Sequence, residues 1–217
     1  MNYDLAKYVP QTQYNVKHPN TLHDWLHFLF LLHRPVYDLE LRSVLRKYKV
    51  GSTKNEEAIL WYIDRSGVVI DGLVKNYYPN DTPPTSNGTI SERLGMHPRE
   101  LCLYGEHLLT ECTNSPVAIV ADEVTAIFMA CVYPAFTWVS CDTDMIPSTA
   151  DLALAGFKVI IANGGDGGTW KRFLRDSKVI VRPDIVDIAN KDFAPFYDEY
   201  LREYNRGLGE RIDDDLT

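Results

Sequence analysis

Two stretches near the start of the chain place apolar residues with the period of a helix. The first, TLHDWLHFLFLLHR, begins at Thr21 and is apolar on most sides, which predicts a buried helix that Thr21 caps and that ends before Pro35. In the second, apolar residues fall at i, i+3, i+4 and i+7: Leu41, Val44, Leu45 and Tyr48. This spacing predicts an amphipathic helix, and Gly51 is placed to end it.

From Ala58 onward the pattern changes to that of β-strands. The runs AILWYI and VVIDGLVKNYYP flank DRSG, a turn that contains glycine, and together they predict a β-hairpin. The later segment NDTPPTSNGTISERLG is rich in turn-forming residues and predicts a loop. We therefore expect residues 1–95 to form an α+β amino-terminal unit with helices and a hairpin, and residues 96–217 to form a second domain.

The second half of the chain alternates strands with helices. The predicted strands are Val117–Val120, Thr137–Ser140, Lys158–Ala162 and the run KVIVRP that starts at Lys178. Helical spacing of apolar residues follows three of them: Val124, Ile127, Phe128 and Cys131, then Trp170, Phe173 and Leu174, then a stripe from Phe193 to Tyr204. This order predicts an α/β domain, with a mostly parallel sheet and helices on both faces.

Composition narrows the class of protein. The chain has 217 residues, 45% hydrophobic and 12% aromatic, which is enough for a buried core and too apolar for a wholly disordered chain. It has no apolar run of about 18 residues, and its start, MNYDLAKYVPQ, has no signal-peptide core, so we expect a soluble, cytoplasmic protein. The four cysteines lack the close pairs of a zinc ribbon, and we expect reduced thiols, three or more of them buried.

Charge is unevenly distributed along the chain. The net charge is -8; residues 1–115 hold 12 Lys and Arg against 13 Asp and Glu, and residues 116–217 hold 10 against 17. The acidic balance argues against a protein that coats nucleic acid. One basic stretch accompanies the second predicted helix and is a candidate nucleic-acid-binding surface: Arg42, Arg46, Lys47 and Lys54. The alternative is an ordinary solvated helix face.

Acidic residues follow three of the predicted parallel strands. Asp122 and Glu123 follow the first, Asp166 lies in NGGDGG after the third, and Asp184 follows the fourth. Ligands gather at the carboxyl ends of such strands, and several carboxylates there would form an oxygen site for Mg²⁺. In the alternative interpretation, Asp122 caps a helix, Asp166 fills a turn and Asp184 begins a helix.

Several segments together resemble one family. YGEHLL and PVAIVADEVTAIFMACVYPAFTWVS, in the region 104–140, are similar to the toprim-like, primase-related proteins of bacterial mobile elements. The resemblance extends back through KYKVGSTK and WYIDRSGVVIDG and forward to FKVII and TWK, and so covers residues 25–200. It implies a compact parallel sheet with helices on both faces, in agreement with the alternation of strands and helices.

The resemblance also implies a catalytic site from which this sequence departs. In the family, a Glu after the first strand is the general acid or base of phosphoryl transfer, and paired Asp residues after the third strand hold Mg²⁺. The family motif resembles IVESEKTA, whereas here it is IVADEVTA, which places Ala121 at the catalytic Glu. Asn163 stands at the first Asp of the second motif, and Asp166 is the nearest match to the second Asp. Alanine neither binds a cation nor transfers a proton.

Three hypotheses follow. The first is a degenerate, non-catalytic toprim-like protein of a mobile element or phage that binds nucleic acid or a protein of DNA replication or defence. The second is an active Mg²⁺-dependent primase-like or nuclease-like enzyme that uses Glu123 and Asp166 as catalytic residues, with Asp122, Asp166 and Asp184 as metal ligands. The third is a structural subunit whose sheet edge holds no ligand. The sequence leaves the oligomeric state open.

Overall fold

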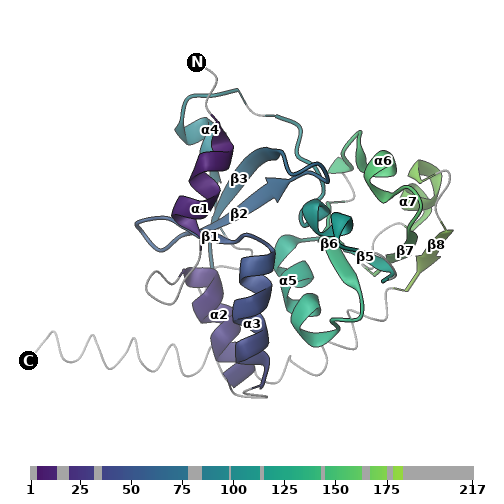
Figure 1. Cartoon of the computed structure of the whole chain (residues 1–217), viewed down its shortest axis with the longest axis horizontal. Coiled ribbons are helices and arrows are strands. Elements are labelled where there is room, and N and C mark those ends of the chain that lie inside the picture. The colour runs from purple at the N-terminus through teal and green to yellow at the C-terminus, as the bar shows by residue number, and fades with distance from the viewer. Residues whose placement is uncertain are drawn as a thin grey trace, which may run out of the picture.

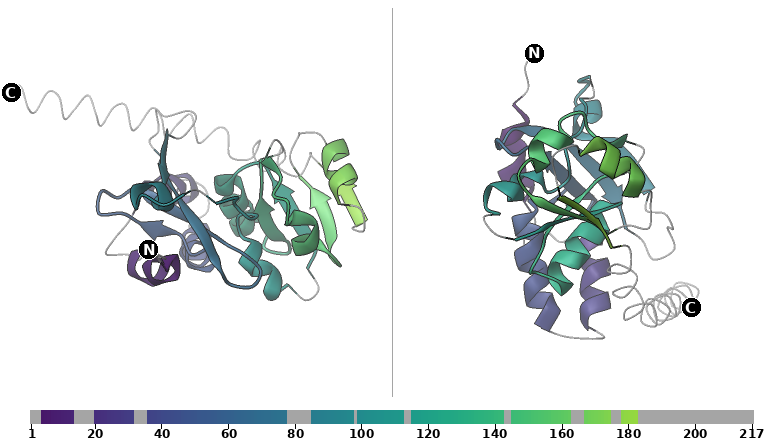
Figure 2. Two further views of the ribbon diagram at one scale, coloured as in Figure 1. Left: turned by 90° about the horizontal axis from the view of Figure 1, so that it is seen from above. Right: turned by 90° about the vertical axis from the view of Figure 1, so that its right-hand side faces the viewer.

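The structure is a computed structural model of the whole chain (Figure 1). It describes residues 4–13, 20–31, 36–77, 85–97, 99–112, 115–142, 145–162, 167–174 and 178–182. Two four-stranded sheets, one antiparallel and one parallel, lie side by side (Figures 1 and 2). The predicted α/β architecture, with an α+β unit and hairpin before a parallel sheet, is confirmed.

The antiparallel sheet has the strand order β1-β2-β3-β4. Its strands are β1 (Gly51–Ser52), β2 (Ala58–Ile63), β3 (Val69–Asn76) and β4 (Thr85–Thr89). β2 and β3 form the predicted hairpin, and the Asp64 side chain closes its turn by accepting hydrogen bonds from the backbone N–H groups of Ser66 and Val68 at 2.8 and 2.9 Å. All six residues of β2 are buried, because helices cover both faces of the sheet.

Four helical segments precede and flank this sheet: η1 (Leu5–Lys7), α1 (Tyr8–Thr12), α2 (Thr21–Leu31) and α3 (Val36–Lys47). The predicted helix from Thr21 is confirmed, but the prediction that Thr21 caps it is wrong. Asn20 is the cap, since its Oδ1 accepts from the His23 N–H at 2.9 Å. The Thr21 hydroxyl instead accepts from the Tyr77 N–H at 3.2 Å and ties the helix start to the end of β3.

The amphipathic helix α3 is also confirmed, with its whole predicted stripe buried: Leu41, Val44, Leu45 and Tyr48. The prediction that Gly51 ends it is wrong, because Gly51 begins β1. Lys49 ends it, with φ at 57° and with Lys49 N–H and Val50 N–H bonded to the carbonyls of Arg46 and Leu45. This is a Schellman motif with lysine where glycine is usual.

The segment expected to be a loop, residues 80–95, contains regular structure. Strand β4 lies within it, followed by α4 (Ile90–Arg93), whose capping box joins Thr89 to Glu92. The sequence TSNGT has no apolar side chain, so no alternation of apolar residues marked it as a strand. Pairing with β3 along one edge supplies the hydrogen bonds that make it one.

The parallel sheet has the strand order β6-β5-β7-β8, and every neighbouring pair is parallel. All four predicted strands are confirmed: β5 (Val117–Val120), β6 (Thr137–Ser140), β7 (Lys158–Ile161) and β8 (Lys178–Val181). The helices are η2 (Glu106–Thr110), α5 (Glu123–Val132), α6 (Ala150–Leu154) and α7 (Gly167–Phe173). The short α6 was not predicted. The helix expected over 193–204 lies outside the described residues.

Alternate residues of β5 face two different cores. Ala118 and Val120 pack with α5 and with α3 of the amino-terminal unit, whereas Val117 and Ile119 pack with α6 and α7. The sheet therefore has helices on both faces, as predicted. The first of these cores extends to Leu22 and Leu60 and so joins residues on both sides of position 95; the boundary there stays a prediction.

Two composition-based expectations can be compared with the described residues. Cys102, Cys131 and Cys141 are buried and all four cysteines are free thiols, as predicted. No helix in the described part of the chain is long and apolar enough to cross a bilayer.

Candidate functional site

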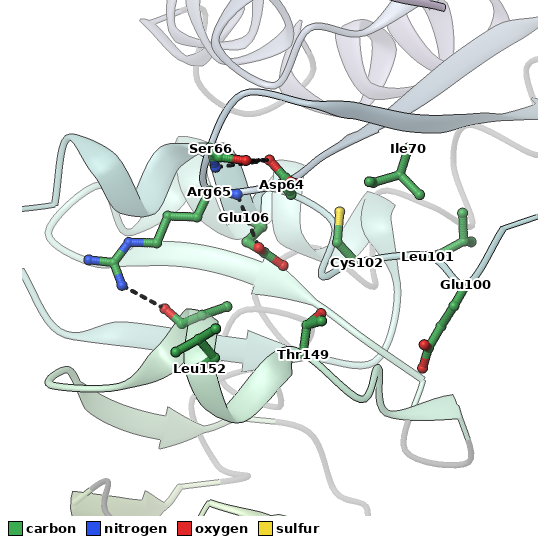
Figure 3. A pocket seen from close by; sticks show the side chains of 11 residues that line it. Asp64, Arg65, Ser66, Ile70, Glu100, Leu101, Cys102, Glu106, Thr149 and Leu152 are labelled. Carbon is green, nitrogen blue, oxygen red and sulfur yellow. Dashed lines mark hydrogen bonds between the residues drawn. The ribbon is translucent and has the colours of Figure 1, made fainter. Parts of the chain in front are cut away.

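A groove separates the hairpin from the carboxyl edge of the parallel sheet. It consists of two adjoining hollows, of about 670 and 470 Å³, that share Glu100, Leu101 and Cys102. Residues from β2 and β3 line one wall, and residues that follow β5 and β6 line the other. Figure 3 shows the smaller hollow, with Arg65 at one end and Glu100 at the other. The groove therefore includes the sheet edge at which the sequence predicts a site.

The residue directly after β5 is Ala121, which is exposed and lines the groove. A side chain at this position can reach into the groove because it leaves the sheet edge before α5 begins. This is the position at which the resemblance implies a catalytic glutamate. A methyl group there offers the groove neither an acid, a base nor a metal ligand.

Asp122 also lines the groove, but its carboxylate caps α5. Oδ1 accepts from the Thr125 N–H at 2.8 Å, and Oδ2 accepts from the Thr125 hydroxyl at 2.7 Å. A helix leaves its first N–H groups unpaired, and an aspartate cap satisfies one of them. The sequence allows Asp122 to be either a metal ligand or a helix cap, and these contacts are those of a helix cap.

Glu123 is buried and joins the two sheets. Its Oε1 accepts a short hydrogen bond from the Tyr62 hydroxyl on β2, and its Oε2 lies 2.8 Å from the Lys75 Nζ on β3. Both oxygens thus have partners on the antiparallel sheet, although Glu123 itself begins α5. The contacts hold the hairpin against the parallel sheet and form one wall of the groove.

Buried tyrosines surround this ion pair. Tyr104 stacks on Tyr48 and meets Tyr62 edge to face. Burial first, and then the nearby Glu123 charge, raise the pKa of Tyr62 well above its usual value, so its hydroxyl stays a donor. The hydroxyls of Tyr77 and Tyr104 are buried without a hydrogen-bond partner in the described residues. This interior is apolar enough that the Glu123 charge depends on its two named partners.

Two further exposed carboxylates on the groove, Glu100 and Asp142, were not singled out from the sequence. Asp142 follows β6, is exposed and lines the larger hollow. Glu100 accepts from the Ser148 N–H and from the Ser148 hydroxyl, both at 2.8 Å, and these bonds lower its pKa. Asp142 could have been found by the same strand-end rule that selected Asp122. Glu100 has no comparable signal, because it lies in an irregular segment.

The other predicted site residues either fall outside the described residues or do not line the groove. Asn163, Asp166 and Asp184 are outside the described residues, so their convergence with Glu123 stays a prediction. The basic residues of the candidate nucleic-acid surface are not among those that line the groove: Arg42, Arg46, Lys47 and Lys54. Arg46, Lys47 and Lys54 are exposed and Arg42 is half-buried; the nucleic-acid role of all four stays a prediction.

The described residues were also compared with the donor set that Mg²⁺ needs. No group of three His, Cys, Asp or Glu side chains among them lies close enough together to hold an ion. Ala121 has no donor atom, and Glu123 is already neutralised by Lys75. The described part of this edge therefore does not fit the carboxylate site that the resemblance implies.

Comparison with known proteins gives one family and several weak structural similarities. A family model described as Domain of unknown function (DUF6371) matches residues 20–163. The search of curated proteins found no match.

Three solved primase structures are similar to this chain, each with a TM-score of 0.40. They are the primase fragment of the bacteriophage T7 primase-helicase (12% identity, 64% of this chain and 59% of that one), the DnaG primase catalytic domain bound to ssDNA (16%, 68% and 63%) and the DnaG catalytic core (16%, 71% and 64%). This chain thus spans about three fifths of each. Similarities of this strength do not by themselves establish an activity.

Proposed function

This chain belongs to the family described as Domain of unknown function (DUF6371), and we propose that it is a non-catalytic, toprim-like protein of a bacterial mobile element or phage. It acts in the cytoplasm by binding nucleic acid or a protein of DNA replication or defence. The groove between the two sheets is its binding site. The resemblance of the segments between residues 25 and 200 supports the origin, and the state of three residues after β5 supports the loss of catalysis.

The contacts of the three residues after β5 are the main support for the loss of catalysis. Ala121 presents a methyl group to the groove, Asp122 caps α5, and Glu123 is buried in a pair with Lys75 and Tyr62. Removing one partner of a buried ion pair costs about 3–5 kcal/mol. Turning Glu123 toward an ion in the groove would break this pair, and turning Asp122 would undo a helix cap. The fold uses these two carboxylates for its own stability.

Metal titration joined to an activity assay tests the proposal. Mg²⁺ and Mn²⁺ are titrated by calorimetry, and labelled single-stranded and duplex DNA are incubated with either metal, with and without nucleoside triphosphates. We expect no binding in the micromolar range and neither cleavage nor primer synthesis. Micromolar metal binding together with cleavage that Asp166→Ala abolishes overturns the proposal.

A gain-of-site pair sharpens this test. Ala121→Glu restores a carboxylate to the groove, whereas Ala121→Gln adds a side chain of the same size without charge. We expect Ala121→Glu to bind Mn²⁺ more tightly than both the wild type and Ala121→Gln. Equal binding by all three proteins would show that the missing carboxylate at position 121 is not what deprives the groove of metal affinity, which would remove this support for the proposal.

One observation favours the second hypothesis, an active Mg²⁺-dependent phosphoryl-transfer enzyme. Asp122 and Asp142 follow neighbouring parallel strands and line the same hollow. With Asp166 and Asp184 they would supply carboxylates to an ion that positions phosphate oxygens and polarises them. Under this alternative, the wild type binds metal, and Asp142→Ala and Asp166→Ala each weaken that binding. Under the non-catalytic proposal, neither the wild type nor the two variants bind metal in the micromolar range.

A further inference from the structure

Apolar side chains line both hollows of the groove. Leu73, Leu101 and Ile146 line the larger hollow, and Ile70 lines the smaller one. Two large apolar side chains on the side of the groove formed by the parallel-sheet domain are exposed to solvent: Met145 is 71% exposed and Leu152 is 74% exposed. They line the same two hollows as these four residues. Exposed apolar side chains that line a groove are typical of an interaction site.

The charged residues that line the groove are mostly acidic. The carboxylates are Asp64, Glu100, Glu106, Asp122, Glu123 and Asp142, and the cations are Arg65, Lys75 and Arg99. Lys75 is neutralised by Glu123. Three of the carboxylates, Glu100, Asp122 and Asp142, are exposed to solvent. A ligand in the groove therefore meets an excess of negative charge.

Internal bonds hold several of these charges in place. The Arg65 guanidinium donates to the Ala153 carbonyl at 3.2 Å and lies over the Phe157 ring at 5.0 Å, which turns it toward α6 (Figure 3). Glu100 is fixed by its two bonds to Ser148, which also lower its pKa and keep it ionised. Glu100 thus offers the groove a negative charge that needs no rearrangement on binding.

We propose that the groove docks an extended segment of a protein partner in which Lys or Arg alternates with apolar residues. The apolar side chains rest on Leu73, Leu101 and Ile146, and the cations meet Glu100, Asp122 and Asp142. This inference rests on the proposed function, because it names the class of partner that the groove binds. Complementary charge selects such a segment and accelerates its association.

The same charges disfavour a nucleic-acid strand in this groove. Each phosphate carries a negative charge, and affinity for the backbone comes from Lys and Arg that neutralise it. Of the three cations that line the groove, Lys75 and Arg65 have the partners given above. Arg99 remains, next to Glu100 in the chain. The acidic groups would repel a strand along most of its path.

Binding of defined probes to the whole protein tests this inference. Three fluorescein-labelled probes are compared by anisotropy at low and physiological salt: a ten-residue peptide alternating Lys with Leu, the same peptide with Glu in place of Lys, and a ten-nucleotide oligothymidylate. We expect only the Lys peptide to bind, with an affinity that falls as salt rises. Binding of the oligothymidylate, without the Lys peptide, would overturn the inference and leave the non-catalytic function standing.

Variants locate the binding site. In the Asp122→Asn/Asp142→Asn protein, the side chain at position 122 still caps α5, because asparagine is as good a cap as aspartate. We expect this double variant to bind the Lys peptide about tenfold more weakly, through the loss of two charge contacts. The control, Glu40→Gln/Glu56→Gln, removes two exposed carboxylates that do not line the groove and should bind as the wild type does. Equal weakening by both double variants would mean that net charge, not the groove, attracts the peptide.

Each failure has its own signature. Micromolar metal binding with DNA cleavage in the earlier assay removes the proposed function itself. Absence of metal binding, together with a Lys peptide that fails to bind or binds the Asp122→Asn/Asp142→Asn protein at full strength, removes only the docking inference.

Discussion

Two of the buried glutamates among the described residues, Glu57 and Glu123, have the same kind of surroundings, although only Glu123 lies where chemistry is expected. Glu57 receives two hydrogen bonds from the Arg93 guanidinium, at 2.9 and 3.0 Å, and others from Thr53 and Asn87. It ties β4 and α4 to the start of β2, and it is not among the residues that line the groove. Glu123 pairs with Lys75 and Tyr62 and ties one sheet to the other. The comparison shows that Glu123 is bound as a structural glutamate is, by one cation and by neutral donors.

The two pairs differ in how far their cations are buried. The Lys75 side chain is 19% exposed and that of Arg93 is 38% exposed, whereas the two carboxylates are similar, at 8% and 11%. A cation left behind by loss of its partner is costly in proportion to its burial. The Glu123 pair should therefore matter more to stability, even though it has fewer hydrogen bonds than the Glu57 cluster.

The largest expected effect is that of Glu123→Ala. It leaves the Lys75 ammonium and the Tyr62 hydroxyl without a partner between the sheets, and we expect the free energy of unfolding to fall by about 3–5 kcal/mol. Urea denaturation followed by tryptophan fluorescence measures it. Glu123→Ala/Lys75→Met, which removes both charges, should recover part of the loss. A Glu123→Ala protein of wild-type stability would contradict the structural role and reopen the catalytic one.

Glu57→Ala should have a smaller effect, about 2 kcal/mol. Arg93 can turn into solvent, so the cost is mainly that of the lost hydrogen bonds and of Asn87 and Thr53 left half-satisfied. The same urea experiment compares the two variants directly. If Glu57→Ala is the more damaging of the two, burial of the cation is not what sets the difference between the sites.

Asp122 allows a finer distinction at the edge of the groove. Asp122→Ala removes the α5 cap and should cost about 1 kcal/mol, whereas Asp122→Asn keeps the cap and should cost almost nothing. The thermal midpoints of the two variants measure this difference. A metal ligand would give another pattern: Asn would lower metal affinity almost as much as Ala, with no relation to stability.

The smallest effect is on the pH dependence of stability. Hydrogen bonds from Arg93 lower the pKa of Glu57 below its unfolded-state value, so the contribution of this group is fully present above the unfolded pKa and is lost as pH falls through the folded pKa. Glu57→Gln removes the titration, and its stability should fall less than that of the wild type between about pH 5 and pH 3. Parallel stability curves for the two proteins would show that Glu57 is not held ionised by Arg93.

The elements with a strong apolar pattern were predictable one by one. The hairpin, the strands β5 to β8 and helices α2, α3 and α5 follow from apolar spacing, because burial of one or both faces imposes a period on the sequence. Strand β4 has no such pattern, since TSNGT is polar and owes its structure to pairing with β3. The predictions for the ends of α2 and α3 were wrong because helix ends, too, depend on hydrogen bonds and not on apolar spacing. Asn20 caps α2 with its side chain, and α3 ends at Lys49 through backbone hydrogen bonds.

For the candidate site, the sequence predicted which edge of the parallel sheet lines the groove, but not which partners the side chains at that edge contact. The rule that ligands gather at the carboxyl ends of parallel strands selected Asp122 and Glu123, and both line the groove. It could not show that the partners of Glu123 are Tyr62 and Lys75, because these lie 61 and 48 residues away in the chain. The periodic spacing of apolar residues within a helix or strand gives no information about contacts between residues so far apart in the chain.

The sequence by itself therefore determined the α/β class, the parallel strands, and the presence of Ala121 directly after β5, because these depend on local spacing and on residue identity. Only the tertiary structure showed that Glu123 forms a buried ion pair with Lys75 and that Leu73, Leu101, Asp122 and Asp142 line one groove. These contacts form where the two sheets pack together. The side chains involved are far apart in the chain, so their spacing in the sequence does not predict the contacts.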